Sequence, residues 1–186
     1  LVPLNLESVA VLQYTGGTTG LAKGAMLSHG NLVANMQQVY ACMSQHGNDG
    51  SPVFQEGKEI MIAPLPLYHI YAFTANCMCM MVSGNHNILV KATAERWEQM
   101  TGCRIVEGYG LTETSPVAST NPYGDKSRLG TVGIPVPGTA MKVIDDEGNE
   151  LALGERGELC IKGPQVMLGY WNRPEATTEA LDSDGW

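Results

Sequence analysis

The sequence has 186 residues, of which 44% are hydrophobic, a composition typical of a globular protein with one core or two small ones rather than a disordered chain. Its formal net charge is -8, with 11 Lys and Arg against 19 Asp and Glu, so we expect no nucleic-acid partner. The five cysteines are odd in number and lack CxxC spacing, which disfavours a disulfide framework or a zinc site and indicates reduced thiols in a cytoplasmic protein.

Two features argue against membrane insertion. The first residues, LVPLNLESVA, have no basic segment followed by a long apolar run, so we expect no signal peptide. The longest apolar stretch, IYAFTANCMCMMV at residues 70–82, is shorter than the roughly 20 residues that span a bilayer. It predicts a buried helix, whose flexible methionines either pack in the core or adapt to an acyl chain.

The N-terminal third predicts a hairpin followed by a helix. Residues 8–14 (SVAVLQY) and 23–29 (KGAMLSH) are both strand-like, and the short glycine-rich connection lets them pair. Ser28 or Asn31 can cap the following helix. The apolar positions at helical spacing in that helix are Leu32, Met36, Val39 and Met43.

The next segments alternate between strand and helix patterns. An exposed polar loop at residues 45–57 precedes a strand at 59–66, the apolar helix at 70–82 and a strand at 86–90. Such alternation predicts an α/β arrangement over a largely parallel sheet.

The junction between Val90 and Lys91 breaks this pattern. The strand-like NILV runs directly into KATAERWEQM, which is helix-like, without Gly, Pro, Asn or Asp between them. Connections from strand to helix normally need about 2 to 6 residues with turn chemistry. We therefore expect that a segment is missing between Val90 and Lys91.

The second half changes character. Residues 103–110 predict a short strand that ends in a glycine turn, and short strands separated by Gly and Pro follow. The four carboxylates of DDEGNE (residues 145–150) fit a solvated turn between strands better than a metal site. We expect an α/β nucleotide-binding subdomain at residues 1–120 and a small β subdomain at 121–186.

The stretch YTGGTTGLAKG, Tyr14 to Gly24, has the chemistry of a phosphate-binding loop. Glycines let backbone N–H groups approach a ligand, and the threonine hydroxyls and Lys23 supply further donors. A plain hairpin loop would explain the glycines but not the threonines and the lysine together. The Walker A spacing does not fit, because Gly20 lies three residues before Lys23 and Gly24 follows it.

A second stretch, EGYGLTETSP at residues 107–116, combines an aromatic ring, hydroxyls and carboxylates around a glycine turn. An aromatic ring such as that of Tyr109 can stack on a base, and a carboxylate can bind Mg²⁺ that bridges phosphates. The alternative is a strand end with a capped turn.

Four blocks in this order resemble the adenylate-forming superfamily of acyl-CoA synthetases, luciferases and peptide-synthetase adenylation domains, and above all bacterial long-chain fatty-acid CoA ligases. They are YTGGTTGLAKG, PLPLYHIYAF, EGYGLTETSP and GELCIKGPQVMLGYWNRPEAT. The resemblance implies part of a large N-terminal domain, with a mostly parallel sheet and helices followed by a small β-barrel-like subdomain. The family's mobile C-terminal domain is expected to be absent from these 186 residues.

The resemblance also implies roles for single residues. His69 matches the position beside the acyl carboxylate, and Thr112 the hydroxyl near the α-phosphate. Tyr109 matches the residue that stacks on adenine, and Glu113 the Mg²⁺ ligand. Gly108 and Gly110 line the wall where adenylate and acyl group meet. The positions matching the loop that holds the β- and γ-phosphates of ATP are Thr15, Gly16, Gly17, Thr18, Thr19, Gly20 and Lys23.

The activity implied is that of an AMP-forming acid–thiol ligase, which converts a fatty acid, ATP and CoA into acyl-CoA with Mg²⁺. The resemblance leaves room for a homodimer and for peripheral association with the cytoplasmic face of the inner membrane. The 186 residues alone are expected to be inactive. Two alternatives stay open, namely a non-catalytic nucleotide-binding fragment and a ligase for another carboxylic acid, aryl or medium-chain.

Overall fold

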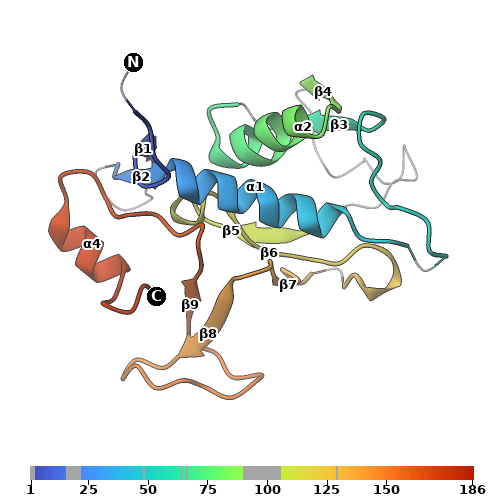
Figure 1. Ribbon diagram of the computed structural model, residues 1–186. Coiled ribbons are helices and arrows are strands. Elements are labelled where there is room, and N and C mark those ends of the chain that lie inside the picture. The colour runs from blue at the N-terminus through green and yellow to red at the C-terminus, as the bar shows by residue number, and fades with distance from the viewer. Residues whose placement is uncertain are drawn as a thin grey trace.

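The computed structural model describes residues 3–15, 22–47, 49–63, 65, 67–89, 106–128 and 130–186. Helix α1 (His29–Met43) crosses the centre of the molecule. The helical segments η1 (Ala72–Met78) and α2 (Cys79–Val82) lie on one side of it, and the sheet that contains β5 (Gly108–Gly110) lies on the other (Figure 1). The chain is therefore layered around α1.

The hairpin predicted before α1 is confirmed. Strands β1 (Val9–Tyr14) and β2 (Gly24–Ser28) pair antiparallel. Ser28 ends β2 and caps α1, because its Oγ accepts the N–H of Asn31 while the Asn31 side chain accepts the N–H of Ser28. Both residues named from the sequence thus take part in one reciprocal cap.

The central α/β unit also follows the predicted order. Strands β3 (Ile60–Ala63) and β4 (His86–Leu89) pair in parallel, and η1 and α2 form the helical crossover between them. Parallel strands need such a crossover. Residues 72–78 form a π-helix, which the apolar pattern did not indicate.

The α/β class is confirmed, but among the described strands parallel pairing is restricted to β3 and β4. The other described strand pairs are antiparallel. Strands β6 (Val117–Thr120) and β7 (Ile134–Pro135) follow β5 in one antiparallel sheet. This sheet crosses the boundary expected at residue 120, and the division into subdomains stays a prediction.

The C-terminal part consists of a hairpin and a short helix. Strands β8 (Ala140–Ile144) and β9 (Glu158–Lys162) pair antiparallel, and α4 (Pro174–Ala180) follows. The turn predicted at residues 145–150 is present, with the Asp145 side chain accepting the N–H groups of Glu147 and Asn149. Short 3₁₀ turns at η3 (Thr112–Thr114) and η4 (Gly124–Lys126) complete the described elements.

One buried face of α1 is polar, which the sequence reading missed. Asn31, Asn35 and Gln38 are buried at helical spacing. Asn35 accepts the N–H of Val117 and donates to the carbonyl of Val117, at 3.2 and 2.8 Å. It therefore acts on β6 as a strand neighbour would, satisfying both backbone groups of one residue.

The other two amides bind loops from the C-terminal part. Asn31 Nδ2 donates to the carbonyls of Pro164 and Val166, at 2.9 and 2.8 Å. Gln38 Nε2 donates to the Pro137 carbonyl at 2.8 Å and to Gln165 Oε1 at 3.2 Å. We refer to Asn31, Asn35 and Gln38 as the amide face of α1.

Several predictions fall on residues outside the described ranges. These are the junction at Val90 and Lys91, the helix expected at residues 91–100, and the start of the strand expected at 103–110. The four cysteines in the described part, Cys42, Cys77, Cys79 and Cys160, are free thiols. None of the helices described here combines the length and the apolarity required to cross a membrane.

Replacing Asn35 by Leu tests the amide face. The change leaves the Val117 N–H without its Asn35 acceptor and the Val117 C=O with only a 3.5 Å bond from Gln165 Nε2. An unsatisfied buried polar group costs about 1–3 kcal/mol, so we expect the free energy of unfolding to fall by about 2–4 kcal/mol. Gln37 is exposed on the same helix and provides the control. Gln37→Leu should change the free energy of unfolding by less than about 0.5 kcal/mol. Urea unfolding measures both, and equal losses would contradict the role of Asn35.

Candidate active site

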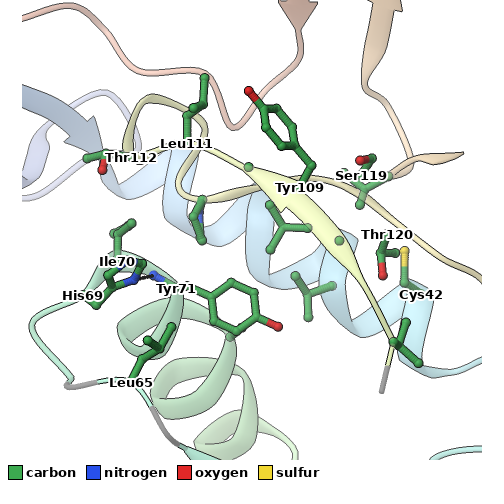
Figure 2. A pocket seen from close by; sticks show the side chains of 18 of the residues that line it. Cys42, Leu65, His69, Ile70, Tyr71, Tyr109, Leu111, Thr112, Ser119 and Thr120 are labelled. Carbon is green, nitrogen blue, oxygen red and sulfur yellow. Dashed lines mark hydrogen bonds between the residues drawn. The ribbon is translucent and has the colours of Figure 1, made fainter. Parts of the chain in front are cut away.

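A cavity of about 640 Å³ lies between the helix that contains η1 and strand β5 (Figure 2). It has the size of an ordinary small-molecule site. Residues from five separate stretches of the sequence line it, and seven of them are site residues predicted above. These seven are Thr15, His69, Gly108, Tyr109, Gly110, Thr112 and Glu113.

The two sides of β5 differ in character. Figure 2 shows the Tyr109 ring on one side of the strand, with His69, Tyr71 and Leu65 on the other. The alternation of side chains along a strand explains this, because Gly108 and Gly110 leave the second side open. Apolar side chains complete the wall there, among them Val39, Met43, Met61 and Ile70.

The glycines on either side of Tyr109 are required by the fold itself. A Cβ on Gly110 would lie 1.8 Å from the carbonyl oxygen of Pro116, and one on Gly108 would lie 2.8 Å from that of Ser119. Any larger residue would therefore push β5 away from the strand that follows it. The close approach holds the turn with Thr112 and Glu113 against the cavity.

Hydrogen bonds fix this turn from inside. The Thr114 hydroxyl accepts the N–H of Leu111 at 2.9 Å. Ser115 adopts a left-handed conformation with φ of 64°, and its hydroxyl donates to the Gln165 carbonyl at 2.8 Å. The carbonyl of Glu113 accepts the N–H of Met167 at 2.8 Å. These hydrogen bonds fix the backbone of the turn that carries the half-buried residues Thr112 and Glu113.

His69 stands exposed at the start of the helix that lines the cavity. Its carbonyl accepts the N–H of Phe73 at 2.9 Å, and its Nδ1 accepts the N–H of Tyr71 at 3.3 Å (Figure 2). A side chain that accepts a hydrogen bond there caps the first turn. Because Nδ1 is an acceptor, the neutral ring carries its proton on Nε2, which can donate to a ligand.

The glycine loop is described only at its ends. Residues 16–21 lie outside the described ranges, so the predicted roles of Gly16, Gly17, Thr18, Thr19 and Gly20 stay predictions. At the loop's ends the N–H of Thr15 donates to the Lys23 carbonyl at 2.9 Å. Thr15 lines the cavity, whereas Lys23 is not among the lining residues. The Lys23 ammonium lies 5.1 Å from the centre of the Tyr170 ring.

Tyr170 lies behind the cavity wall and contacts the site residue Glu113, a contact that sequence reasoning missed. Its hydroxyl donates to Glu113 Oε1 at 2.6 Å, and the residue is 8% exposed. Burial, followed by the hydrogen bond and the charge of Glu113, raises the pKa of Tyr170 above its ordinary value. The available signal was its place in GYWNRPEAT, one of the blocks that carry the family resemblance.

The carboxylate of Glu113 fits a magnesium ligand. One oxygen accepts the Tyr170 hydroxyl, while its second oxygen has no hydrogen bond to any described residue. Mg²⁺ is usually held by one or two carboxylates together with substrate phosphates and water. Glu113 is a half-buried carboxylate on the cavity wall, with one oxygen held by a hydrogen bond and the other available to coordinate the metal.

A family model described as AMP-binding enzyme matches residues 1–93 and 89–171. The chain belongs to the AMP-binding enzyme family. It is 40% identical, over 97% of its length, to a long-chain-fatty-acid–CoA ligase of Salmonella typhimurium, and 27% identical, over its whole length, to 4-coumarate–CoA ligase 1 of Petroselinum crispum. The recognition made from the four blocks is confirmed at the level of the family.

Solved structures support the same assignment. ATP-bound MatB from Rhodopseudomonas palustris superposes with a TM-score of 0.82 at 26% identity, and the match covers 99% of this chain and 45% of that one. The chain spans 41% of the length of the Salmonella relative. The chain thus corresponds to less than half of the Salmonella ligase and of MatB.

The matches also bear on the chain near Val90. The alignment with the Salmonella ligase extends over 236 positions, whereas this chain has 186 residues, so at least 50 positions (236 less 186) have no residue of this chain. The two stretches matched by the family model meet at residues 89–93. The family matches therefore overlap at the place where the strand-like and helix-like patterns adjoin without a turn.

Replacing Gly110 by Ala tests the close approach of β5. The new Cβ meets backbone that cannot move cheaply, so we expect the unfolding free energy to fall by more than about 2 kcal/mol. Gly24→Ala is the matched control in a strand, because its Cβ would meet the Tyr14 ring at an ordinary 3.4 Å. Thermal unfolding compares the two, and a Gly110→Ala protein as stable as the Gly24→Ala protein would refute the packing argument.

Proposed function

We propose that this chain is the core of the N-terminal domain of a long-chain fatty-acid CoA ligase. A fatty-acid carboxylate attacks the α-phosphorus of ATP, which yields acyl adenylate and pyrophosphate, and the CoA thiolate then displaces AMP to form the thioester. One observation carries the proposal. A single cavity is lined both by the braced polar turn with Thr112 and Glu113 and by an apolar wall, in a chain 40% identical to a ligase of that name.

The polar side of the cavity suits the nucleotide. Tyr109 would stack on adenine with its ring on one side of β5. Thr112 would donate its hydroxyl near the α-phosphate, and Thr15 with the adjoining glycine loop would hold the β- and γ-phosphates. Mg²⁺ bound through Glu113 would neutralise developing phosphate charge.

Local positive charge can hold a triphosphate on this acidic chain. Two unit charges 4 Å apart interact by about 4 kcal/mol at an effective dielectric constant of 20. Lys23 follows the glycine loop directly and would act at such short range. The net charge of -8 is spread over the whole chain and is screened by salt. The short-range attraction between Lys23 and the phosphates therefore outweighs the repulsion from the rest of the chain.

The other side of β5 suits the acyl group. The open faces of Gly108 and Gly110 lead to the apolar side chains of Val39, Met43 and Met61. Each buried CH₂ contributes about 0.8 kcal/mol, so the depth of such a wall selects chain length. His69 at the rim would donate from Nε2 to the carboxylate that reacts.

A ligase for an aryl acid is the second candidate. Tyr71 and Tyr123 also line the cavity, and burial raises the pKa of Tyr123 to about 12, which keeps its ring neutral. The 27% identity to a 4-coumarate–CoA ligase supports this candidate. The third candidate is a nucleotide-binding fragment that catalyses no reaction. The assay of thioester formation described below tests it as well.

The proposal includes a missing segment between Val90 and Lys91. Its support is the surplus of at least 50 alignment positions (236 less 186) and the meeting of the two family matches at residues 89–93. Strand β4 pairs with β3 in a sheet of two strands, and an additional α/β unit would extend that sheet. The cavity would then be completed by residues that this sequence does not contain.

The substrate class is tested with a full-length protein that carries this sequence. We expect CoA thioester formation from palmitate with ATP and Mg²⁺, slower formation from octanoate, and slower still from 4-coumarate. Mass spectrometry of the thioesters measures the rates. The 186 residues assayed alone in parallel should form no thioester. Preference for 4-coumarate would favour the aryl candidate, and an inactive full-length protein would leave only the non-catalytic reading.

Lys23→Ala in the same full-length protein tests the phosphate loop. Losing a charged contact with phosphate should raise the KM for ATP by about tenfold or more and leave the KM for the fatty acid within about twofold. Fatty-acid-dependent exchange of pyrophosphate into ATP measures both. Lys58→Ala, at an exposed position outside the cavity lining, is the control. An unchanged KM for ATP and an unchanged rate would refute the assignment of Lys23.

A further inference from the structure

Tyr170 is held between the two polar parts of the candidate site. Its neighbours bind β2, which directly follows the glycine loop. Met26 N–H donates to the Gly169 carbonyl at 2.8 Å, and Trp171 N–H donates to the Gly24 carbonyl at 2.8 Å. The N–H of Tyr170 donates to Thr177 Oγ1 at 2.9 Å, which ties the residue to α4. The backbone of Tyr170 is thus fixed from two sides.

The side chain of Tyr170 faces both charged groups assigned to ATP binding. Its hydroxyl donates to Glu113 Oε1 at 2.6 Å, and its ring lies 5.1 Å from the Lys23 ammonium. A hydrogen bond to a carboxylate restricts the rotation of that group, and an aromatic face attracts a cation. One rigid side chain therefore contacts the groups assigned to the metal and to the terminal phosphates.

A purely structural tyrosine is the competing explanation. The Tyr170 ring packs in the core cluster with Ala25, Leu27 and Ile70, so part of its role is packing. Packing alone does not require the Tyr170 hydroxyl to donate to the carboxylate of Glu113, whose other oxygen has no hydrogen bond to a described residue. It also does not require the ring face to lie beside the lysine that follows the glycine loop. Both contacts address groups that the proposed function needs at defined positions.

We propose that Tyr170 is a positioning residue that orients Glu113 toward Mg²⁺ through its hydroxyl and Lys23 toward the phosphates through its ring. The inference rests on the proposed function, because it concerns the same nucleotide site. Tyr170 touches neither substrate nor metal and acts through the two side chains.

The two contacts can be separated by substitution. Tyr170→Phe removes the hydroxyl and keeps the ring, whereas Tyr170→Leu removes both. Tyr40→Phe is the matched control, since the Tyr40 hydroxyl also donates to a carboxylate, that of Glu56, and neither residue lines the cavity. Thermal unfolding of each full-length variant separates a loss of stability from a loss of binding.

Binding of Mn²⁺, used as a spectroscopic substitute for Mg²⁺, is followed by electron paramagnetic resonance in the presence of a non-hydrolysable ATP analogue. We expect Tyr170→Phe to weaken the binding of Mn²⁺ by about tenfold, the scale found when partners of metal ligands are removed. Binding of the analogue without metal should stay within about twofold of wild type. Tyr170→Leu should weaken both, because Lys23 loses its contact as well.

A double variant tests whether Tyr170 acts through Glu113. If it does, Glu113→Gln combined with Tyr170→Phe binds Mn²⁺ no more weakly than Glu113→Gln alone. If the fold-losses in Mn²⁺ affinity of the two single variants multiply in the double variant, Tyr170 acts independently of Glu113, and the inference is overturned. Wild-type affinity in Tyr170→Phe, with Tyr40→Phe also unchanged, would overturn it while the proposed function stands. A wild-type protein that binds neither analogue nor Mn²⁺ would overturn both.

Discussion

The arrangement of this chain depends on the hydrogen bonds of one helix face. The segments that α1 supports include loops whose backbone groups have no strand beside them. Asn31, Asn35 and Gln38 supply donors and acceptors to residues 117, 137, 164 and 166, and Gln165 joins the same network through Gln38. Buried backbone groups are expensive to leave unpaired, so these three amides decide where the loops lie.

The candidate site follows from that support. The loop after β9 carries Gln165, whose carbonyl holds Ser115, and Met167, whose N–H holds Glu113. The same loop continues to Tyr170, which contacts Glu113 and Lys23. The polar turn, the end of the glycine loop and the loop 164–170 are therefore parts of one hydrogen-bonded assembly on α1.

The sequence predicted best what depends on neighbouring residues. The hairpin of β1 and β2, the cap by Ser28 and Asn31, and the turn at residues 145–150 are confirmed, because each arises from local spacing and local hydrogen bonds. Alternation of strand and helix indicated the class but not which strands pair. The seven predicted residues that meet at the cavity were recognised from family motifs, not from periodicity. Their roles stay predictions.

Three features were beyond that reasoning. The positions of Asn31, Asn35 and Gln38 have helical spacing, but the apolar residues beside them dominated the pattern. The π-helix at η1 leaves no compositional mark in an apolar stretch. The contact between Tyr170 and Glu113 joins residues 57 positions apart, and no local rule relates them.

The bonds from Asn31 to the loop after β9 also bear on the order in which the molecule assembles. They span 133 and 135 residues, so they close only after a long search by the chain. During synthesis the glycine loop and its hairpin leave the ribosome long before the residues that brace them, since domains emerge from the N-terminus at about 5–20 residues per second. For those seconds β2 presents an unpaired edge, which is a point of self-association in a nascent chain and a place where a chaperone would bind.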